Sequence, residues 1–582
     1  MVYTGKPSRG CGMCKSRRIK CDEKRPTCGN CKKSGRDCPG YPDEFDLVFR
    51  DENKAMAKKA KKASGPSASR SSTTGSSSHA SPLFSRSPSL EVSPGESSFQ
   101  VALSRTPSDL SLSQQLLALP NYKTPPLPLD ETFDFQAFVW NLEHAVPPTI
   151  TLAPECEAIP FFFKNFITLP QQAESTRGYL EYLVPLYNRA RPSSVLHLAT
   201  TAVAMAVCGQ YPGRQELLRD AVSTYGKALT KLNDDLKDPV MSKSDETVLA
   251  ILMFSLYEVS RLVASARSST IMSTDDTIAA WGNHVDGAVA LTKLRGTDQF
   301  NDPMSHAIFR AVRTMMITSC VQRSKPVDDF PGTKGWVGHG DISEENAANR
   351  LTLICIDLPN LRARANLLTT TLYDEAKESE AKQIMDFAQM VDGNLEEWYR
   401  TLPPEWKHRI IGVASDPIGP DDIALAERWP GEQHVYHDVP LASIINDYRV
   451  CRIFCRRVIM GCVTWLSLGS YVGNNSAVYD KSVYVIQQMV DEISACIPFH
   501  MNYELQPVAK ELGQEQNAAE AFGGYSLVWP LYVAANAETV AQDQRDWLFG
   551  RLSVIGTKFG LSSAQVLVLA RRHVLTCGPM FP

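Results

Sequence analysis

The chain has 582 residues, 43% of them hydrophobic, and a formal net charge of −4 at pH 7. Such a length allows several domains, and such an apolar content allows a sizeable core. The longest apolar stretches, residues 195–207 and 248–257, are too short or too polar to span a bilayer, so we expect a soluble protein and no membrane partner. The charge is uneven, because residues 1–36 hold eleven basic and two acidic residues while the remainder is acidic. This asymmetry indicates affinity for nucleic acid at the N-terminus alone.

A regular array of six cysteines opens the chain, with the spacing C-x2-C-x6-C-x6-C-x2-C-x6-C. Its members are Cys11, Cys14, Cys21, Cys28, Cys31 and Cys38. Two separate tetrahedral zinc sites would need eight thiolates, so six suffice for two Zn²⁺ ions only if two sulfurs bridge. The unit Cys-x2-Cys-x6-Cys occurs twice, and the first cysteine of each copy, Cys11 or Cys28, is the natural bridging ligand.

The segment around these cysteines has almost no apolar core. Metal binding must therefore supply most of its folding free energy, roughly 10 kcal/mol or more. A disulfide framework is the alternative, but nothing at the N-terminus resembles a secretory signal, so we expect a reducing compartment. Among the scattered remaining cysteines, Cys451 and Cys455 are four residues apart on a predicted helix, and we expect reduced core thiols there.

Residues 11–28 resemble the fungal Zn2Cys6 binuclear-cluster transcription factors. All six cysteine positions match without gaps, and Pro26 stands where the family turns its inter-helix loop. The resemblance implies a small module of two short helices and loops over residues 1–44. It also implies a nuclear, sequence-specific regulator of RNA polymerase II genes that binds double-stranded DNA and reads a CGG-like triplet in the major groove.

Basic residues of the module are the predicted DNA contacts. A helix starting near Cys14 would carry Arg17 and Arg18 outward. Arginine donates to the O6 and N7 acceptors of guanine, and we expect Arg18 first and Arg17 second to contact bases. The remaining candidates are expected to contact phosphates, and they are Lys15, Lys20, Lys24 and Arg25.

Two further segments precede the large domain. Residues 45–62 form a basic linker whose lysines favour nuclear import over a merely solvated helix end. These lysines are Lys58, Lys59, Lys61 and Lys62. No heptad repeat is sustained here, so the mode of dimerisation stays open. Residues 63–128 are rich in Ser and Pro and are predicted to be disordered.

Residues 129–582 are predicted to form one large all-α domain. Apolar residues recur at helical spacing in residues 195–207, 248–256 and 285–291. The interleaved acids and aromatics of residues 129–143 could form an activation segment, but we favour packing of the aromatics onto the domain. Pro530 is expected to kink or break a helix.

Several stretches of this domain resemble the second type of fungal-specific transcription factor domain, the middle homology region. They are residues 159–163, 178–187 and 281–288, and residues 45–52 after the cysteines also resemble that subgroup. The resemblance implies regulation, effector sensing or self-association. Coregulators of transcription and a second copy of the chain are therefore the expected protein partners.

An enzyme is not expected, because the sequence has no Walker loop, nucleophile elbow, His-Glu-x-x-His or G-x-G-x-x-G after a strand. Asp275 and Asp276 lie in a predicted Ser/Thr-rich loop without a metal-binding companion. His284 could contact a ligand, but a satisfied core or surface histidine is the favoured interpretation.

The sequence therefore predicts a zinc-dependent DNA-binding transcription factor. One alternative is a helical sensor or scaffold whose zinc module binds protein instead of DNA. Another is a regulator whose helical domain is controlled by a small molecule.

Overall fold

The computed structural model describes part of the cysteine module and most of the large domain. The described residues are 11, 13, 14, 17, 19–22, 27–36 and 38, and then 153–568 with gaps at 168–171, 212, 261–273, 333–334, 339–344, 416–417, 470–474, 560, 562–563 and 566. The predicted basic linker, the Ser/Pro-rich linker and residues 129–143 lie outside the described residues.

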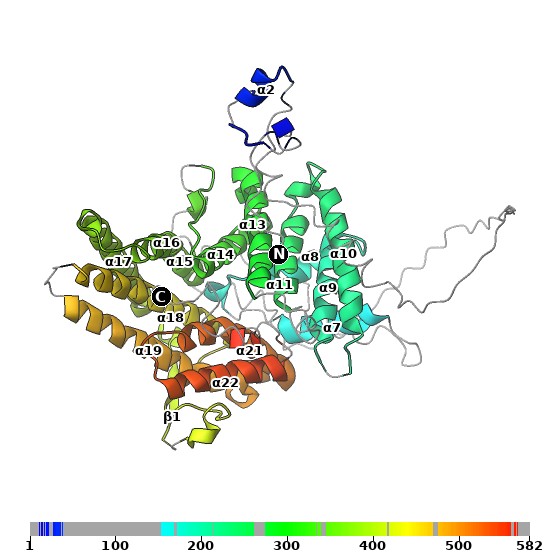
Figure 1. Cartoon of the computed structure of the whole chain (residues 1–582). Helices are drawn as coiled ribbons and strands as arrows, with labels where there is room; N and C mark the ends of the chain where they lie inside the picture. The colour runs from blue at the N-terminus through cyan, green and yellow to red at the C-terminus, as the bar shows by residue number, and fades with distance from the viewer. Residues whose placement is uncertain are drawn as a thin grey trace, which may run out of the picture. The chain divides into compact units, whose positions relative to one another are not determined.

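The large domain is helical, as predicted (Figure 1). Its α-helices are α7 (Pro154–Phe166), α8 (Leu183–Arg189), α9 (Val195–Cys208), α10 (Leu217–Asp235), α11 (Asp245–Ser260), α13 (Thr274–Arg295), α14 (Pro303–Arg323), α15 (Ala347–Ile354), α16 (Leu358–Thr369), α17 (Glu378–Thr401), α18 (Val439–Ser467), α19 (Asn475–Met501), α20 (Pro507–Glu511), α21 (Gln516–Ala535) and α22 (Gln542–Lys558). The three apolar stretches with helical spacing lie in α9, α11 and α13, which confirms those predictions.

Local sequence signals define several helix starts. Ser194 accepts a hydrogen bond from the amide of His197 at the start of α9. Asp302 and Asp438 likewise accept hydrogen bonds from backbone amides in the first turns of α14 and α18. Each of these two helices also has a proline in its first two positions. Such caps satisfy amides that have no partner within the helix.

Apolar packing joins these helices into one core. Helix α9 packs against α7, α10 and α11, and α18 packs against α16, α17 and α19. Buried apolar side chains between Ala158 and Ala564 form one continuous cluster. Among the described residues, no helix combines the length and the apolar character needed to cross a membrane.

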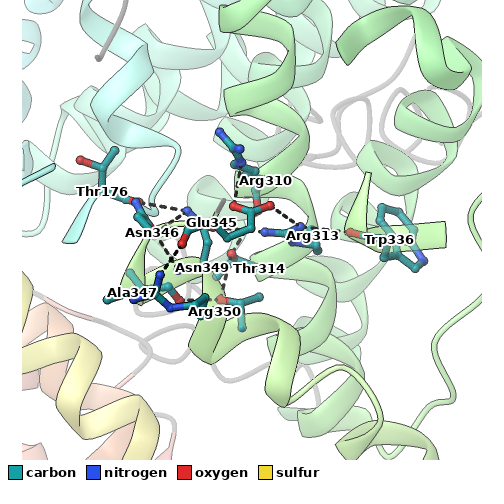
Figure 2. A network of polar contacts seen from close by, with 12 residues as sticks. Thr176, Arg310, Arg313, Thr314, Trp336, Glu345, Asn346, Ala347, Asn349 and Arg350 are labelled. Atoms are coloured by element: carbon teal, nitrogen blue, oxygen red, sulfur yellow. Dashed lines mark hydrogen bonds and ion pairs between the residues drawn. The ribbon is translucent and has the colours of Figure 1, made fainter. Parts of the chain in front are cut away.

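A buried polar network connects distant segments inside this domain (Figure 2). The carboxylate of Glu345 forms ion pairs with Arg310 at 2.9 Å and with Arg313 at 3.1 Å, and both arginines lie on α14. The next residue, Asn346, donates its side-chain amide to the carbonyl of Thr176 at 2.8 Å. The network therefore holds α14, the start of α15 and the segment before α8 in one arrangement.

Three features differ from the sequence-based expectations. Pro530 lies inside α21 and does not break it, and the next residue, Leu531, is fully buried. Asp275 and Asp276 lie in the backbone of the first turn of α13 and not in a loop. A hairpin of β1 (Arg409–Ala414) and β2 (Gly431–Val435) was not predicted.

Candidate metal centre and nucleic-acid interface

The sulfur atoms of the six predicted ligands converge in the N-terminal module. They form two groups of four, whose ligand atoms lie within 4.8 Å of one another. One group is Cys11, Cys14, Cys21 and Cys28, and the other is Cys11, Cys28, Cys31 and Cys38. The two groups share the same two cysteines, the pair that the internal repeat singled out as bridging ligands.

The distances between these sulfurs fit tetrahedral zinc. The Sγ atoms of Cys11 and Cys28 are 3.7 Å apart, those of Cys11 and Cys31 are 3.8 Å apart, and those of Cys14 and Cys28 are 3.7 Å apart. Zinc–sulfur bonds of about 2.3 Å in a tetrahedron place neighbouring sulfurs about 3.8 Å apart. The residues present therefore fit a two-zinc cluster, and the bound ions would tie both halves of the module together.

The backbone repeats the same local geometry in both halves. The amide of Cys14 donates to Sγ of Cys11 at 3.4 Å, and the amide of Cys31 donates to Sγ of Cys28 at 3.3 Å. Cys28 also caps the short helix α2 (Gly29–Lys33). The hydrogen bond from the amide of Cys14 lowers the pKa of the Cys11 thiol, but desolvation opposes it and the net effect is a raised pKa.

Packing the sulfurs together opposes their ionisation. Desolvation, followed by contacts with neighbouring cysteines, raises the pKa of the Cys31 thiol to about 12. Desolvation is also the main cause of the raised pKa of the Cys14 thiol. Thiolates are the zinc-binding form, so the array needs the compensating charge of a metal to hold several of them at neutral pH.

Two polar side chains that were not predicted as functional connect the two halves of the module. The carboxylate of Asp22 accepts from the amide of Gly29, with both oxygens at 3.0 Å. Asn30 donates from its side-chain amide to the carbonyl of Lys20 at 2.8 Å. The sequence signal for Asp22 is its position directly after Cys21, in a segment that is otherwise strongly basic.

The predicted DNA contacts are only partly described. Arg17 and Lys20 are exposed, and Arg17 reaches from the first half toward the hydroxyl of Ser34 at 3.5 Å. The other predicted contacts, Lys15, Arg18, Lys24 and Arg25, lie outside the described residues, as do Lys58, Lys59, Lys61 and Lys62. Exposed cations around buried sulfurs form a surface suited to phosphate binding.

Within the large domain, His284 belongs to a hydrogen-bonded cluster. Its Nε2 atom lies 3.0 Å from the hydroxyl of Tyr225, which donates to Glu258 at 2.7 Å. This confirms the interpretation of a satisfied histidine.

Cys451 and Cys455 are free thiols on α18, and burial raises the pKa of Cys455, as expected for an unreactive core cysteine.

A shallow pocket lies between the start of α18 and the helices α20 and α21. Asp438, Val439, Ala509 and Phe522 are among the residues that line it. Its volume of about 20 Å³ suits a single water molecule. It therefore gives no support to the small-molecule alternative.

Comparisons with known proteins agree with both parts of the chain. Residues 9–46 match the fungal Zn(2)-Cys(6) binuclear cluster domain, and residues 160–323 match the fungal specific transcription factor domain. Transcription factor dbaG of Emericella nidulans is 23% identical over 434 residues, which cover 73% of this chain and 94% of that protein.

Shorter matches concern only a small part of other regulators. White-opaque regulator 2 of Candida albicans is 51% identical over 45 residues, which are 8% of this chain and 10% of that protein. Transcriptional regulatory protein moc3 of Schizosaccharomyces pombe is 52% identical over 44 residues, 7% of this chain and 9% of that protein. No solved structure matches the chain. The matched families and named relatives are regulators of transcription, not enzymes.

Proposed function

We propose that the chain is a fungal Zn2Cys6 transcription factor, which reads CGG-like triplets in the promoters of RNA polymerase II genes in the nucleus. The observation that supports this most is the pair of overlapping four-sulfur groups that share Cys11 and Cys28. We assign these two residues as the bridging ligands of two Zn²⁺ ions. Such a cluster gives a short, basic segment a fixed shape, which base reading requires.

The proposed division of labour follows the chemistry of the basic side chains. Arg18 and then Arg17 donate to guanine, since the guanidinium fork matches the O6 and N7 acceptors. Lys15, Lys20 and the pair Lys24 and Arg25 contact phosphates and set the register of the module on the duplex. Arg17 would exchange its long contact with Ser34 for a contact with DNA.

The helical domain is proposed to regulate this binding. Its support is the family match over residues 160–323 and the similarity to dbaG over most of both chains. We propose coregulators and a second copy of the chain as its partners. We propose the boundaries 1–44, 45–62, 63–128 and 129–582 for the DNA-binding module, basic import segment, disordered linker and regulatory domain.

Selection of binding sites from random duplex DNA by the zinc-loaded full-length chain tests this proposal. We expect CGG-like triplets to be enriched and the enrichment to disappear for Arg18→Ala. Arg400→Ala is the matched control, because it removes an exposed arginine of α17 whose partner is Glu397. No enrichment by a folded, zinc-loaded chain would reject DNA reading and favour the scaffold alternative.

A further inference from the structure

Two histidines and a glutamate meet at the base of the hairpin in the helical domain. His408 directly precedes β1, and Glu432 and His434 lie two residues apart on β2. Strand pairing brings them together, because Ile410 pairs with His434 across the hairpin. The ligand atoms of the three side chains lie within 4.8 Å of one another.

The two imidazole rings have the features of unused metal ligands. They stack with centroids 3.7 Å apart and an angle of 12° between their planes. The Nδ1 atoms of both His408 and His434 are buried and make no hydrogen bond. A buried polar atom without a partner is costly and calls for a specific explanation.

The remaining ring nitrogen of His434 is already oriented. Its Nε2 atom lies 2.9 Å from a carboxylate oxygen of Glu432. A metal ion that takes the place of the proton between Nε2 and this oxygen would bind both atoms, and Nδ1 of His408 is the unpartnered nitrogen that would complete the set. Burial lowers the pKa of both histidines, that of His408 to about 4.

We propose that His408, Glu432 and His434 form a third metal site, which binds a divalent transition-metal ion, with zinc as the expected occupant. Two imidazoles and one carboxylate are a common three-residue ligand set for zinc, with the fourth position open to water. The set lies in the helical domain and shares no ligand with the cysteine cluster.

The charges around the site permit a cation. Arg449 is the cation that lowers the pKa of both histidines, but it is held by Glu492 at 3.0 Å and donates to the hydroxyl of Tyr436 at 2.6 Å. Glu432, half exposed at the rim, then supplies negative charge that Arg449 does not neutralise. A divalent ion would therefore meet one carboxylate and the nitrogens of two imidazoles.

The side chains must move for binding. Tetrahedral bonds of about 2.0–2.1 Å separate ligand atoms by about 3.3 Å, so the stacked rings must turn toward a common point. The bound ion would join the residue before β1 to the end of β2, and β2 itself packs on α19. The site would thus fix the base of the hairpin to the helical core.

Zinc content of the untagged full-length chain tests the site, with zinc alone as the probe. We expect one zinc per chain more in the native protein than in His408→Gln after equilibrium dialysis against micromolar zinc. Glu432→Gln should weaken this zinc by about 10-fold or more. His437→Gln is the matched control, since His437 is an exposed histidine of the same segment that pairs with Asp438, and it should keep the full content.

The outcomes separate this site from the cysteine cluster. Cys28→Ser should lose cluster zinc and keep the hairpin zinc, so failure of one assignment does not affect the other. Equal zinc content in the native chain, His408→Gln and Glu432→Gln would overturn the proposal. Because Glu432 is partly exposed, Glu432→Gln decides the question even if a histidine variant fails to fold, and circular dichroism of metal-free samples checks this.

Discussion

The cysteine module and the helical domain are held together by opposite means. In the described part of the module the buried residues are Cys11, Cys14, Cys28 and Cys31. In the helical domain a continuous apolar cluster extends from Ala158 to Ala564. The module therefore depends on a ligand that the chain does not supply, whereas the domain depends on burial of its own side chains.

Buried charges show the same difference. In the module, close sulfurs need positive charge from bound metal. In the helical domain, the chain supplies both the negative and the positive charges. Asp392 on α17 forms ion pairs with two arginines of α18, Arg452 at 2.9 Å and Arg456. Such pairs stabilise only while complete, since the loss of one partner leaves a buried charge uncompensated.

The largest predicted effect is the loss of a shared sulfur. Cys28→Ser should abolish both cluster sites and forfeit roughly 10 kcal/mol of metal-linked folding free energy. DNA binding should disappear while the helical signal remains. Zinc analysis, DNA-binding assays and circular dichroism of full-length variants measure this.

Two matched serine variants sharpen that result. Cys156→Ser changes an exposed free cysteine of α7 and should have no effect. Cys14→Ser touches only one of the two sulfur groups and should lose less zinc than Cys28→Ser. Equal losses from Cys14→Ser and Cys28→Ser would contradict the bridging assignment.

The next effect lies in the helical domain. Asp392→Asn should lower its free energy of unfolding by about 3–5 kcal/mol, because two buried guanidinium groups lose their charged partner. Glu397→Gln is the control: its pair with Arg400 is exposed, and such pairs contribute about 0–1 kcal/mol. Denaturant unfolding compares them. If both variants lowered the free energy of unfolding by a similar small amount, the buried ion pairs of Asp392 would not be important for stability.

A pH-dependent effect is expected at Glu181. Its side chain accepts from the amides of Arg177 and Gly178, and burial raises its pKa from 4.5 to about 7. Between these values the unfolded chain ionises while the folded chain keeps the proton, so stability falls as pH rises. Above pH 7 the accumulated loss is about 3 kcal/mol.

Glu181→Gln removes this ionisation and keeps an acceptor oxygen for the two amides. We expect the variant to be more stable than the native chain by about 3 kcal/mol at pH 8 and by less than about 1 kcal/mol at pH 4.5. Thermal or denaturant unfolding at both values measures the difference. A gain that is independent of pH would show that ionisation of Glu181 is not the cause.

The smallest effect concerns a surface charge of the module. Lys20→Ala should leave zinc content and unfolding unchanged, because Lys20 is exposed. It should weaken DNA binding about equally for all sequences and reduce the slope of affinity against salt by about 1. Altered sequence preference would instead assign Lys20 to base reading.

The sequence predicts the module better than the domain for a physical reason. The ligands of the cluster lie within 28 residues, so their spacing alone encodes the sulfur geometry, including the sharing of Cys11 and Cys28. Helix periodicity likewise located α9 and α11, because burial on one face leaves a local pattern.

Features that depend on contacts between residues far apart in the sequence were not predicted. Pro530 does not break α21, and the proline rule alone could not tell a break from continuation of the helix. The hairpin site depends on pairing between segments over twenty residues apart. Its one local signal is the alternation of Glu432 and His434, which places both side chains on one face of a strand.

Stepwise removal of zinc by a chelator from the full-length chain tests whether DNA reading depends on the cluster, with DNA binding and helical content followed in the same samples. We expect CGG-selective binding to be lost as the cluster zinc leaves, helical content to be largely retained, and added zinc to restore binding. Selective binding that persists in the zinc-free chain would contradict this dependence.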